Sequence, residues 1–248
     1  MPPTPEVETY DYALFGEVER RPFSRVRQVI ARRLSASWTA VPHVSQFDEC
    51  DLTMLNALRQ GMAIKDTGVK LTVLAFAMKA CANALKSFPD FNASLDTRTN
   101  ELVLKKYCHV AFAAETPIGL LAPVVRDVDR KSLMDVAVAI QVLADKARSG
   151  KLAMSDAEGA CFTITNLGQL GGTGFTPIIN APEIAILGMG RASPRVVEVG
   201  GAFVTRQMLP LTLVYDHRVI DGAVGGRFLF HVIEQLRDPK QLLADALV

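Results

Sequence analysis

The chain has 248 residues, of which 49% are hydrophobic and 21% are charged, and its formal net charge is +1. A chain of this length buries most of the surface that it exposes when unfolded, and this composition excludes extensive disorder. The near-neutral charge offers no electrostatic footprint for nucleic acid or an anionic membrane, and no apolar run reaches the ~20 residues of a membrane helix. The high apolar content predicts a sheet covered on both faces, or an apolar surface that meets another subunit.

The N-terminal segment, residues 1–21, has no helical or strand period and carries three prolines in its first five positions. Such a segment is typical of an extended arm or of the end of a linker. From Ser24 the pattern becomes helical, with apolar residues on one face and arginines on the rest, and Pro42 ends it. We therefore expect an arm at 1–21 followed by one folded domain at 22–248.

Helices and strands alternate irregularly through this domain. In chain order, the pattern predicts a strand at 43–50, a helix capped by Asp51, a buried helix at 72–87, short strands near Ala93, Leu102 and Val110, a strand at 120–125, a helix from Ser132 to Gly150, strands at 161–165, 184–187 and 195–199, a long strand ending at Tyr215, and a helix from Asp221. The run LTLVY at 211–215 is apolar on both faces, which is typical of a central strand. This order predicts an α/β fold, a mixed β-sheet with flanking helices.

The four cysteines lie far apart and among apolar residues; they are Cys50, Cys81, Cys108 and Cys161. None of them forms a Cys-x-x-Cys pair. We therefore expect buried free thiols in a reducing compartment, and neither disulfides nor a zinc site.

The strongest local feature is the segment YDHRVIDG at 215–222. A buried strand stops at His217, and Asp221 then opens a helix. A histidine at the end of a strand directs its ring into the cleft beyond the sheet, where an imidazole accepts a proton near neutral pH. The alternative is a core histidine bonded to the backbone, which the crowded polar cluster disfavours. Both His217 and Asp221 are legitimate metal ligands, but no third ligand has a recognisable spacing, so we predict no metal.

A second feature is the strand FTITNLG at 162–168, which leads into a glycine-rich loop. The hydroxyl of Thr165 and the amide of Asn166 offer hydrogen-bond donors where the backbone can approach a ligand closely. The alternative is that the threonines are ordinary strand formers and that the glycines only shape a turn. The loop is not a phosphate-binding loop, and Gly188-Met189-Gly190 lacks the third glycine of a dinucleotide fingerprint.

A covalent nucleophile is not evident in the sequence. There is no Gly-x-Ser-x-Gly elbow, and no cysteine has a recognisable partner histidine. Chemistry by His217 would therefore be base catalysis on a nucleophile carried by a substrate.

Four segments resemble the catalytic domain of the dihydrolipoamide acyltransferases, the core component of 2-oxo-acid dehydrogenase complexes. They are SRVRQVIARRLSASWTAVPHVSQF at 24–47, ETPIGLLAPVVRDVDRKSL at 115–133, FTITNLGQLGGTGFTPIINAPEIAILG at 162–188 and DHRVIDGAVGGRF at 216–228. The resemblance implies a chloramphenicol acetyltransferase-like fold that forms homotrimers, with active sites between subunits. It also implies that coenzyme A and a lipoyl arm enter a channel from opposite ends, and that trimers assemble into a cubic or dodecahedral core.

The resemblance also assigns roles to residues. His217 matches the base that takes the proton from the thiol of coenzyme A, so that the thiolate attacks the acyl thioester on dihydrolipoamide. Thr165 stands where some members have a serine whose hydroxyl stabilises the tetrahedral oxyanion, and Asp221 matches an aspartate that orients the site or stabilises charge. Arg33 is the expected partner of Asp221 or of a nearby loop, and Asn166 is expected to support the site.

Partners and location follow from the same resemblance. Complete members carry lipoyl domains and a small domain that binds the dehydrogenase components, and neither pattern occurs in these 248 residues. The lipoyl group and those components would therefore reach this domain through segments absent from the chain. The segment GGTGFTPIINAPEIAILG at 171–188 is most like that of bacterial pyruvate complexes. This likeness implies an acetyl substrate, coenzyme A as co-substrate and a cytoplasmic location. From net charge, hydropathy and ligand spacing we expect no nucleic acid, no membrane and no metal.

Two other functions stay open at this point. One is a stand-alone coenzyme A-dependent acetyltransferase acting on a small hydroxyl or amine, which the extended match outside the histidine motif disfavours. The other is a non-catalytic scaffold subunit of the complex, which the retention of His217, Asp221 and Thr165 disfavours.

Overall fold

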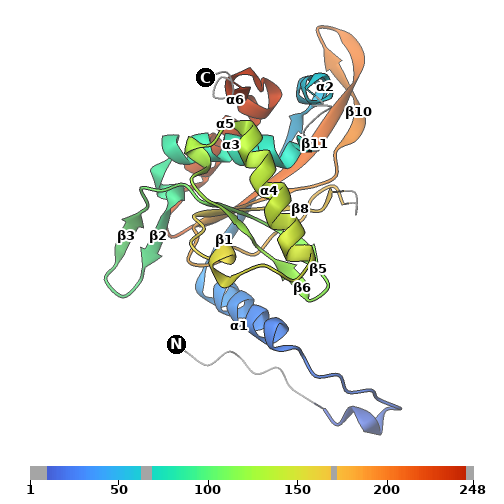
Figure 1. Ribbon diagram of the computed structural model, residues 1–248, viewed down its shortest axis with the longest axis vertical. Helices are drawn as coiled ribbons and strands as arrows, with labels where there is room; N and C mark the ends of the chain where they lie inside the picture. Colours follow the sequence, from blue (N-terminus) through green and yellow to red (C-terminus); the bar gives the residue numbers. More distant parts are fainter. Residues whose placement is uncertain (1–9, 63–68, 169–171, 244–248) are drawn as a thin grey trace.

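The structure is a computed structural model that describes residues 10–62, 69–168 and 172–243. Seven of its strands form one mixed sheet through the protein (Figure 1). They are β1 (His43–Asp51), β4 (Val110–Phe112), β7 (Val124–Val125), β8 (Phe162–Asn166), β9 (Ala185–Met189), β10 (Ser193–Val199) and β11 (Ala202–Asp216). Their order is β1-β11-β9-β8-β4-β7, and β10 pairs with the first half of β11. Because β4, β8 and β9 run parallel and the other pairs antiparallel, the predicted mixed sheet is confirmed.

Two hairpins stand beside the main sheet. One pairs β2 (Ala93–Asp96) with β3 (Glu101–Leu104), and the other pairs β5 (Ala114–Thr116) with β6 (Gly119–Leu121). In Figure 1 the β2–β3 hairpin and the β10–β11 ribbon extend from opposite sides of the body.

Helices cover the sheet unequally on its two faces. They are α1 (Arg25–Ala40), α2 (Thr53–Gly61), α3 (Val73–Ser87), α4 (Leu133–Arg148), α5 (Gly222–Arg237) and α6 (Lys240–Leu243). Helix α3 packs against α4 and α5, and the three contribute to the main core with one face of the sheet. Helix α1 lies on the other side of the sheet in Figure 1.

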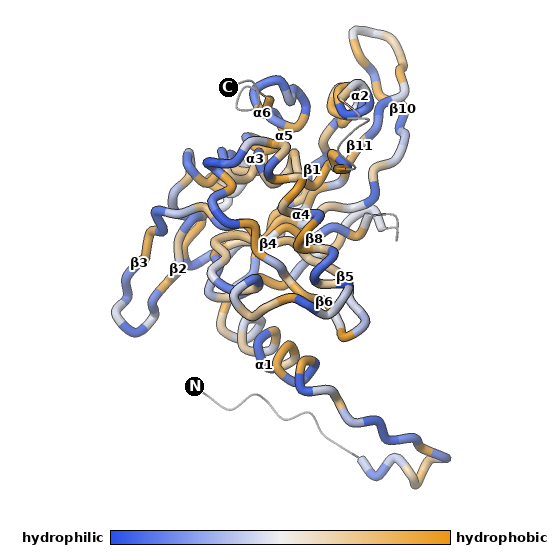
Figure 2. Tube along the Cα trace, in the orientation of Figure 1, coloured by the Kyte–Doolittle hydropathy of each residue, from blue (hydrophilic) through white to orange (hydrophobic). Residues whose placement is uncertain are grey.

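Strand β11 shows why this sheet needs two covered faces. Alternate side chains of a strand point to opposite faces, and Leu211, Leu213 and Tyr215 join the main core beneath α3 and α5. The next residue in the alternation, Val214, instead forms a second small core with Val41, Ile179 and Ile186. Both sets are buried, so the prediction of a central strand is confirmed. Figure 2 shows the same concentration of apolar residues along the middle strands.

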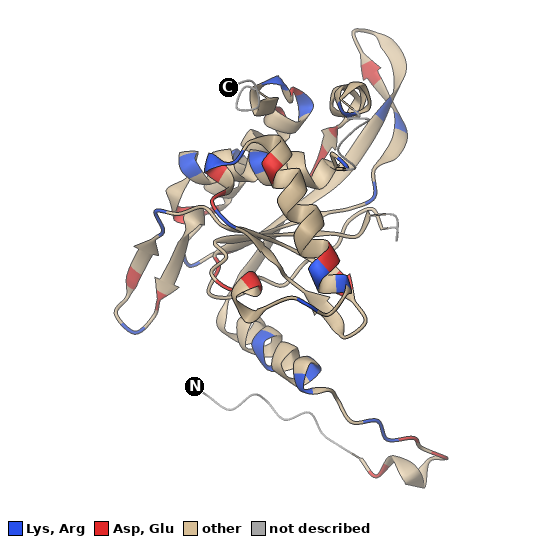
Figure 3. Ribbon diagram, viewed as in Figure 1, with Lys and Arg blue, Asp and Glu red and all other residues tan. Residues whose placement is uncertain are grey.

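Helix α1 is poorly covered by its own chain. Ser37 is its one buried residue, whereas Leu34 is 39% exposed and Trp38 is 59% exposed. The described part of the predicted arm, residues 10–21, is exposed throughout and runs away from the body (Figure 1). In Figure 3 the charged residues along the α1 ribbon are basic. The apolar stripe of this helix, which includes Leu34 and Trp38, is thus left largely uncovered by the described part of the chain. The domain boundary expected at residue 21 stays a prediction.

The sequence predictions of single elements need two corrections. The strand expected at 120–125 is divided into β6 and β7, because Pro123 has no N–H for a ladder and its carbonyl accepts from Phe112 instead. Helix α2 has Leu52 as its N-cap rather than Asp51, although the Asp51 carboxylate does accept the Thr53 N–H at 2.8 Å.

The prediction for the cysteines is confirmed. All four cysteines are free and buried, as predicted. None of the helices among the described residues has the combined length and apolar character that crossing a membrane requires.

Gly225 allows α5 to approach the sheet closely. A Cβ at this position would lie 2.7 Å from Cε1 of Tyr215 and 2.9 Å from Oε1 of Gln46. Tyr215 of β11 is buried and Gln46 of β1 is half-buried, so a side chain here would push α5 away from the sheet.

We predict that Gly225→Ala destabilises the protein by about 1–3 kcal/mol, because overpacking displaces well-packed neighbours. Thermal unfolding should show a melting temperature lower by several degrees. Gly61→Ala is the matched control: it meets no atom within 4 Å, so it should be neutral or stabilising by up to about 1 kcal/mol. Equal melting temperatures for the two variants would contradict this account.

Candidate active site

The backbone at the end of β11 is anchored on both sides. Asp216, the last residue of the strand, donates its N–H to the Ile184 carbonyl at 2.9 Å and accepts the N–H of Val219 at 3.0 Å. His217 donates its N–H to the Pro42 carbonyl at 3.1 Å. The residue that carries the candidate base is therefore tied to the segment before β9 and to the turn between α1 and β1.

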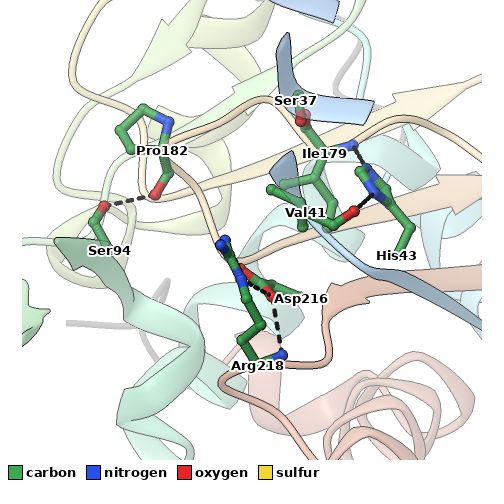
Figure 4. A network of polar contacts seen from close by, with 8 residues as sticks. All are labelled: Ser37, Val41, His43, Ser94, Ile179, Pro182, Asp216 and Arg218. Carbon is green, nitrogen blue, oxygen red and sulfur yellow. Dashed lines mark hydrogen bonds and ion pairs between the residues drawn. The ribbon is translucent and has the colours of Figure 1, made fainter. Parts of the chain in front are cut away.

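An ion pair closes the same turn. Arg218 donates Nη2 to Oδ2 of Asp216 at 2.6 Å and Nε to Oδ1 at 3.0 Å (Figure 4). The Asp216 side chain is 2% exposed and that of Arg218 is 35% exposed, so a surface cation satisfies a buried carboxylate. The Asp216 carboxylate, which accepts these hydrogen bonds, raises the pKa of the Arg218 guanidinium. The ion pair thus joins the residues on either side of His217, Asp216 and Arg218, and fixes the backbone between them.

The side chain of His217 is open to its surroundings. It is exposed, and its ring centroid lies 6.2 Å from that of Tyr215. Within the described part of the chain, no hydrogen bond involves its imidazole. The alternative of a core histidine bonded to the backbone is therefore not what the structure shows, and both ring nitrogens are available to a substrate.

Asp221 lies at the N-cap of α5 without acting as a cap. Its backbone is extended, but its side chain makes no capping hydrogen bond, so the carboxylate stays available. Burial, and secondarily the charge of Asp221, raise the pKa of the Tyr215 phenol, which places that charge near the end of β11. Among the described residues, no three His, Cys, Asp or Glu side chains are grouped so as to hold a metal ion.

Residues 179–184, here called the bridging segment, link the His217 turn to other elements. His43 of β1 donates Nδ1 to the Val41 carbonyl at 2.7 Å, and its Nε2 accepts the Ile179 N–H at 3.1 Å. These two bonds assign the ring proton to Nδ1. Ser37 of α1 donates its hydroxyl to the Ile179 carbonyl at 2.6 Å (Figure 4). One end of the bridging segment is thus clamped from both sides of its backbone.

Glu183 is a buried carboxyl at the other end of the bridging segment. It is 3% exposed and accepts hydrogen bonds from Thr163 Oγ1 at 2.7 Å and Asn180 Nδ2 at 3.0 Å. Burial raises the pKa of Glu183 to about 7, against the lowering effect of those two bonds. Nearby, Ser94 donates its hydroxyl to the Pro182 carbonyl at 2.7 Å (Figure 4).

Thr165 and Asn166 end strand β8 on opposite faces. Thr165 is half-buried and lies in register with Gly188 of β9. Gly188 has no side chain, and the ring of Phe175 occupies the space, 3.1 Å from where a Cβ would lie. Asn166 is exposed and accepts the Gly168 N–H at 2.7 Å through Oδ1, which shapes the start of the glycine-rich loop.

Asn166 also lines a cavity of about 470 Å³ at the ends of β4 and β8. The other lining residues come from the start of α3, from β4 and β5, and from α4; they are Thr72, Val73, Leu74, Phe112, Ala113, Ala114, Glu115, Ile140, Ala144 and Arg148. Asn166 thus lines this cavity, while Thr165 projects to the other face of the sheet. Residues 169–171 of the predicted glycine-rich loop lie outside the described residues.

One chain does not bring Thr165 and His217 together. In the sheet register, Thr165 of β8 pairs with Gly188 of β9, and Gly188 pairs with Thr212 of β11. His217 lies five residues after Thr212. Five residues of strand span about 16 Å and two strand spacings about 10 Å. The two side chains therefore start roughly 20 Å apart, far beyond the reach of one small reacting centre.

Arg33 is exposed on α1. Within the described residues it forms no hydrogen bond or ion pair with Asp221, so the expected contact is not made inside one chain.

The side chains Ser37, His43 and Glu183 were not predicted from the sequence as parts of this region. A glutamate at the start of the apolar run EIAIL, where a charge is costly to bury, was the available signal for Glu183.

A chloramphenicol acetyltransferase matches with a TM-score of 0.53 over 83% of this chain and 94% of its own, at 13% identity. At this identity the match shows the fold alone, and the predicted chloramphenicol acetyltransferase-like class is confirmed.

The sequence family described as "2-oxoacid dehydrogenases acyltransferase (catalytic domain)" matches residues 15–244. The chain belongs to this family. A relative from Pseudomonas aeruginosa, the dihydrolipoyllysine-residue acetyltransferase component of the pyruvate dehydrogenase complex, is 54% identical over 245 residues, which are 98% of this chain. The match covers 44% of that relative, so the chain spans less than half of its length.

Two solved structures are similar throughout. One comes from an investigation of a serine, a histidine and an asparagine in the catalytic mechanism of Azotobacter vinelandii dihydrolipoamide acetyltransferase. It has a TM-score of 0.92 at 50% identity, over 96% of this chain and 99% of its own. The other is described as the cubic core of the pyruvate dehydrogenase multienzyme complex, with a TM-score of 0.92 at 51% identity and the same coverage.

We predict that the stability difference between the unmodified protein and Glu183→Gln depends on pH. Because the folded pKa of Glu183 is raised to about 7 from an ordinary 4.5, the folded state holds a proton that the unfolded state has released. Raising the pH through this window therefore lowers the free energy of unfolding of the unmodified protein by up to about 1.4 kcal/mol per pH unit, relative to the uncharged variant.

Melting temperatures measured at pH 5, 6, 7 and 8 test this. The unmodified protein should lose several degrees relative to Glu183→Gln over the series. Glu101→Gln, an exposed position on β3, should show no such trend. A constant difference for Glu183→Gln would show that its carboxyl does not titrate in this range.

Proposed function

We propose that this chain transfers an acyl group, specifically acetyl, between dihydrolipoamide and coenzyme A as the catalytic domain of a pyruvate dehydrogenase-type complex. Family membership supports acyl transfer, and the name of the Pseudomonas aeruginosa relative supports the acetyl group and the complex. The observation that carries the proposal is His217, an open imidazole on a backbone anchored at both neighbours.

The spacing of three residues supports their assignment. In the Azotobacter vinelandii enzyme, the serine under investigation precedes the histidine by the same number of positions as Thr165 precedes His217. The asparagine follows that histidine as Asp221 follows His217. Threonine keeps the hydroxyl and adds a methyl group, and aspartate replaces an amide by a charge. The two substitutions preserve an oxygen at each position while altering rotamer freedom and electrostatics.

The mechanism follows from these positions. The imidazole of His217 takes the proton from the thiol of coenzyme A, and the thiolate attacks the thioester carbonyl of acetyl-dihydrolipoamide. The tetrahedral oxyanion accepts a hydrogen bond from the Thr165 hydroxyl. Collapse expels the dihydrolipoamide thiolate, which takes the proton back from the imidazolium and leaves acetyl-coenzyme A. The Asp221 carboxylate stabilises the cationic imidazolium or orients the turn that carries it.

Assembly is part of the proposal, because one chain holds Thr165 and His217 roughly 20 Å apart. A homotrimer would complete each site with His217 from one chain and Thr165 from the next. The exposed apolar stripe of α1 and the exposed arm supply surface for such contacts. The cubic core at 51% identity supports further assembly of trimers into a cube, with dehydrogenase components and the lipoyl group reaching the core through other segments. Bacterial relatives and buried free thiols support a cytoplasmic location.

We predict that His217→Ala lowers acetyl transfer by about 10²- to 10⁴-fold, because a positioned base contributes this much. Thr165→Ala should cost on the order of 3 kcal/mol of transition-state stabilisation, near the lower end of that range, and Thr165→Ser should retain most activity. The assay follows acetyl-coenzyme A with free dihydrolipoamide, and light scattering confirms that each variant still assembles. An assembled His217→Ala protein with full activity would refute the mechanism.

The same assay separates the neighbouring functions. Acetyl-coenzyme A should be used faster than succinyl- or isobutyryl-coenzyme A, and dihydrolipoamide should be preferred to hydroxylated or amine acceptors. Preference for a small hydroxyl acceptor would instead support a stand-alone acetyltransferase. An assembled but inactive unmodified protein would support a scaffold subunit.

A further inference from the structure

Glu183 is a buried ionisable group that the proposed mechanism does not use. A carboxylate is costly to bury unless it is hydrogen-bonded, and in a folded protein such a group calls for a reason. Its position suggests such a reason. One of its hydrogen bonds connects it to the strand of Thr165, and the residue that follows it is bonded to the residue before His217.

The first link runs to Thr165. Thr163, which donates its hydroxyl to Oε2 of Glu183 at 2.7 Å, precedes Thr165 by two residues on β8. Residues two apart in a strand share one face of the sheet. The Glu183 carboxyl therefore holds the same face of the strand that presents the Thr165 hydroxyl.

The second link runs to His217. Ile184, the residue after Glu183, accepts the N–H of Asp216 at 2.9 Å. Asp216 precedes His217 and forms the ion pair with Arg218. A shift of the bridging segment relative to β8 would therefore move the strand end that carries the base.

The ionised form suits this arrangement better than the protonated form. A carboxylate accepts from Thr163 and Asn180 at once, whereas a protonated carboxyl carries a donor, so that one bond is reversed or lost. The charged and titratable groups around it are Lys105, just after β3, and the Cys161 thiol, just before β8. Burial lowers the pKa of Lys105, and its ammonium donates to the Ala93 carbonyl at 3.1 Å.

We propose that Glu183 is a positioning residue for the proposed acetyl transfer: its ionised carboxylate sets β8 against the bridging segment and so aligns Thr165 and His217. The inference rests on the proposed function. Each chain contributes Thr165 to one site and His217 to another, so each Glu183 supports two sites at once. Ionisation of the buried Glu183 lowers the free energy of unfolding. The alignment of Thr165 and His217 therefore carries a cost in stability.

The kinetic test compares the assembled unmodified protein with Glu183→Gln from pH 6 to pH 8.5. Glutamine has nearly the same shape, and Asn180 can turn its amide to accept from it. We expect kcat at pH 8 to fall about tenfold or more with KM within about twofold, since a small misalignment of reacting groups costs this much. At pH 6 the ratio of the two kcat values should shrink to about twofold. Glu101→Gln should match the unmodified protein at every pH.

A merely structural role would give a different result. It would lower kcat by the same factor at every pH, and a ratio that stays constant within twofold would overturn the proposal. So would a Glu183→Gln kcat within twofold of the unmodified value at pH 8. Both outcomes presuppose that the unmodified protein transfers acetyl groups; if it does not, the proposed function fails and not the positioning role.

A second variant covers the case in which Glu183→Gln does not assemble. Thr163→Val removes the hydroxyl donor and preserves the shape of the side chain, and it should lower kcat at pH 8 by a similar factor. Where both variants assemble, the double variant should be no slower than the slower single variant, because the two groups act through one contact. Multiplied losses in the double variant would show independent roles and would contradict the proposal.

Discussion

A single buried carboxylate, that of Asp216, organises the end of the central strand. Its N–H, its carbonyl and both its side-chain oxygens are engaged, by Ile184, Val219 and Arg218. An unpaired carboxylate in this position would be strongly destabilising, so the turn has little freedom to adopt other shapes. The backbone of His217 is held in place by this turn, while its imidazole is exposed. The backbone is thus fixed and the ring remains accessible to a substrate.

The two faces of the sheet have different tasks. The face beneath α3, α4 and α5 forms the main core and supplies most of the apolar burial. The other face carries Thr163, Thr165 and Val214, and is covered only in part by α1 and the bridging segment. This face therefore combines a buried polar contact, between Thr163 and Glu183, with the half-buried Thr165. The apolar residues are thus divided between the main core on one face of the sheet and a partly exposed surface, which includes α1, on the other.

Local signals in the sequence predict local structure well. Ser24, Thr72 and Ser132 precede periodic runs, and each caps a helix in the structure. The apolar run at 211–215 identifies the central strand because burial on both faces removes the alternation of polar residues. The histidine motif identifies His217 because a strand end and a helix start coincide there. The resemblance to a family supplies the roles expected of Thr165 and Asp221, which spacing alone leaves ambiguous.

Contacts between distant segments are what the sequence does not predict. His43 and Ile179 are 136 positions apart, and no periodicity relates them. The separation of Thr165 from His217 depends on strand register, which is set by packing across the whole sheet. Glu183 reads as an ordinary charged residue before a strand until its neighbours are known. The expected contact between Arg33 and Asp221 illustrates the same limit, because a pairing inferred within one chain need not be made there.

The exposure of α1 has a consequence for local stability. A helix with one buried residue gains little from its own chain, so it should open and close at low free energy and exchange its amide hydrogens readily while unpartnered. The chain that follows α1 includes Pro42, whose carbonyl anchors the His217 backbone. The least protected helix thus adjoins the anchor of the candidate base. If a neighbouring chain covered α1, the His217 amide that donates to Pro42 would exchange more slowly. The backbone around the candidate base would then become more rigid on assembly and less rigid when dilution separates the chains.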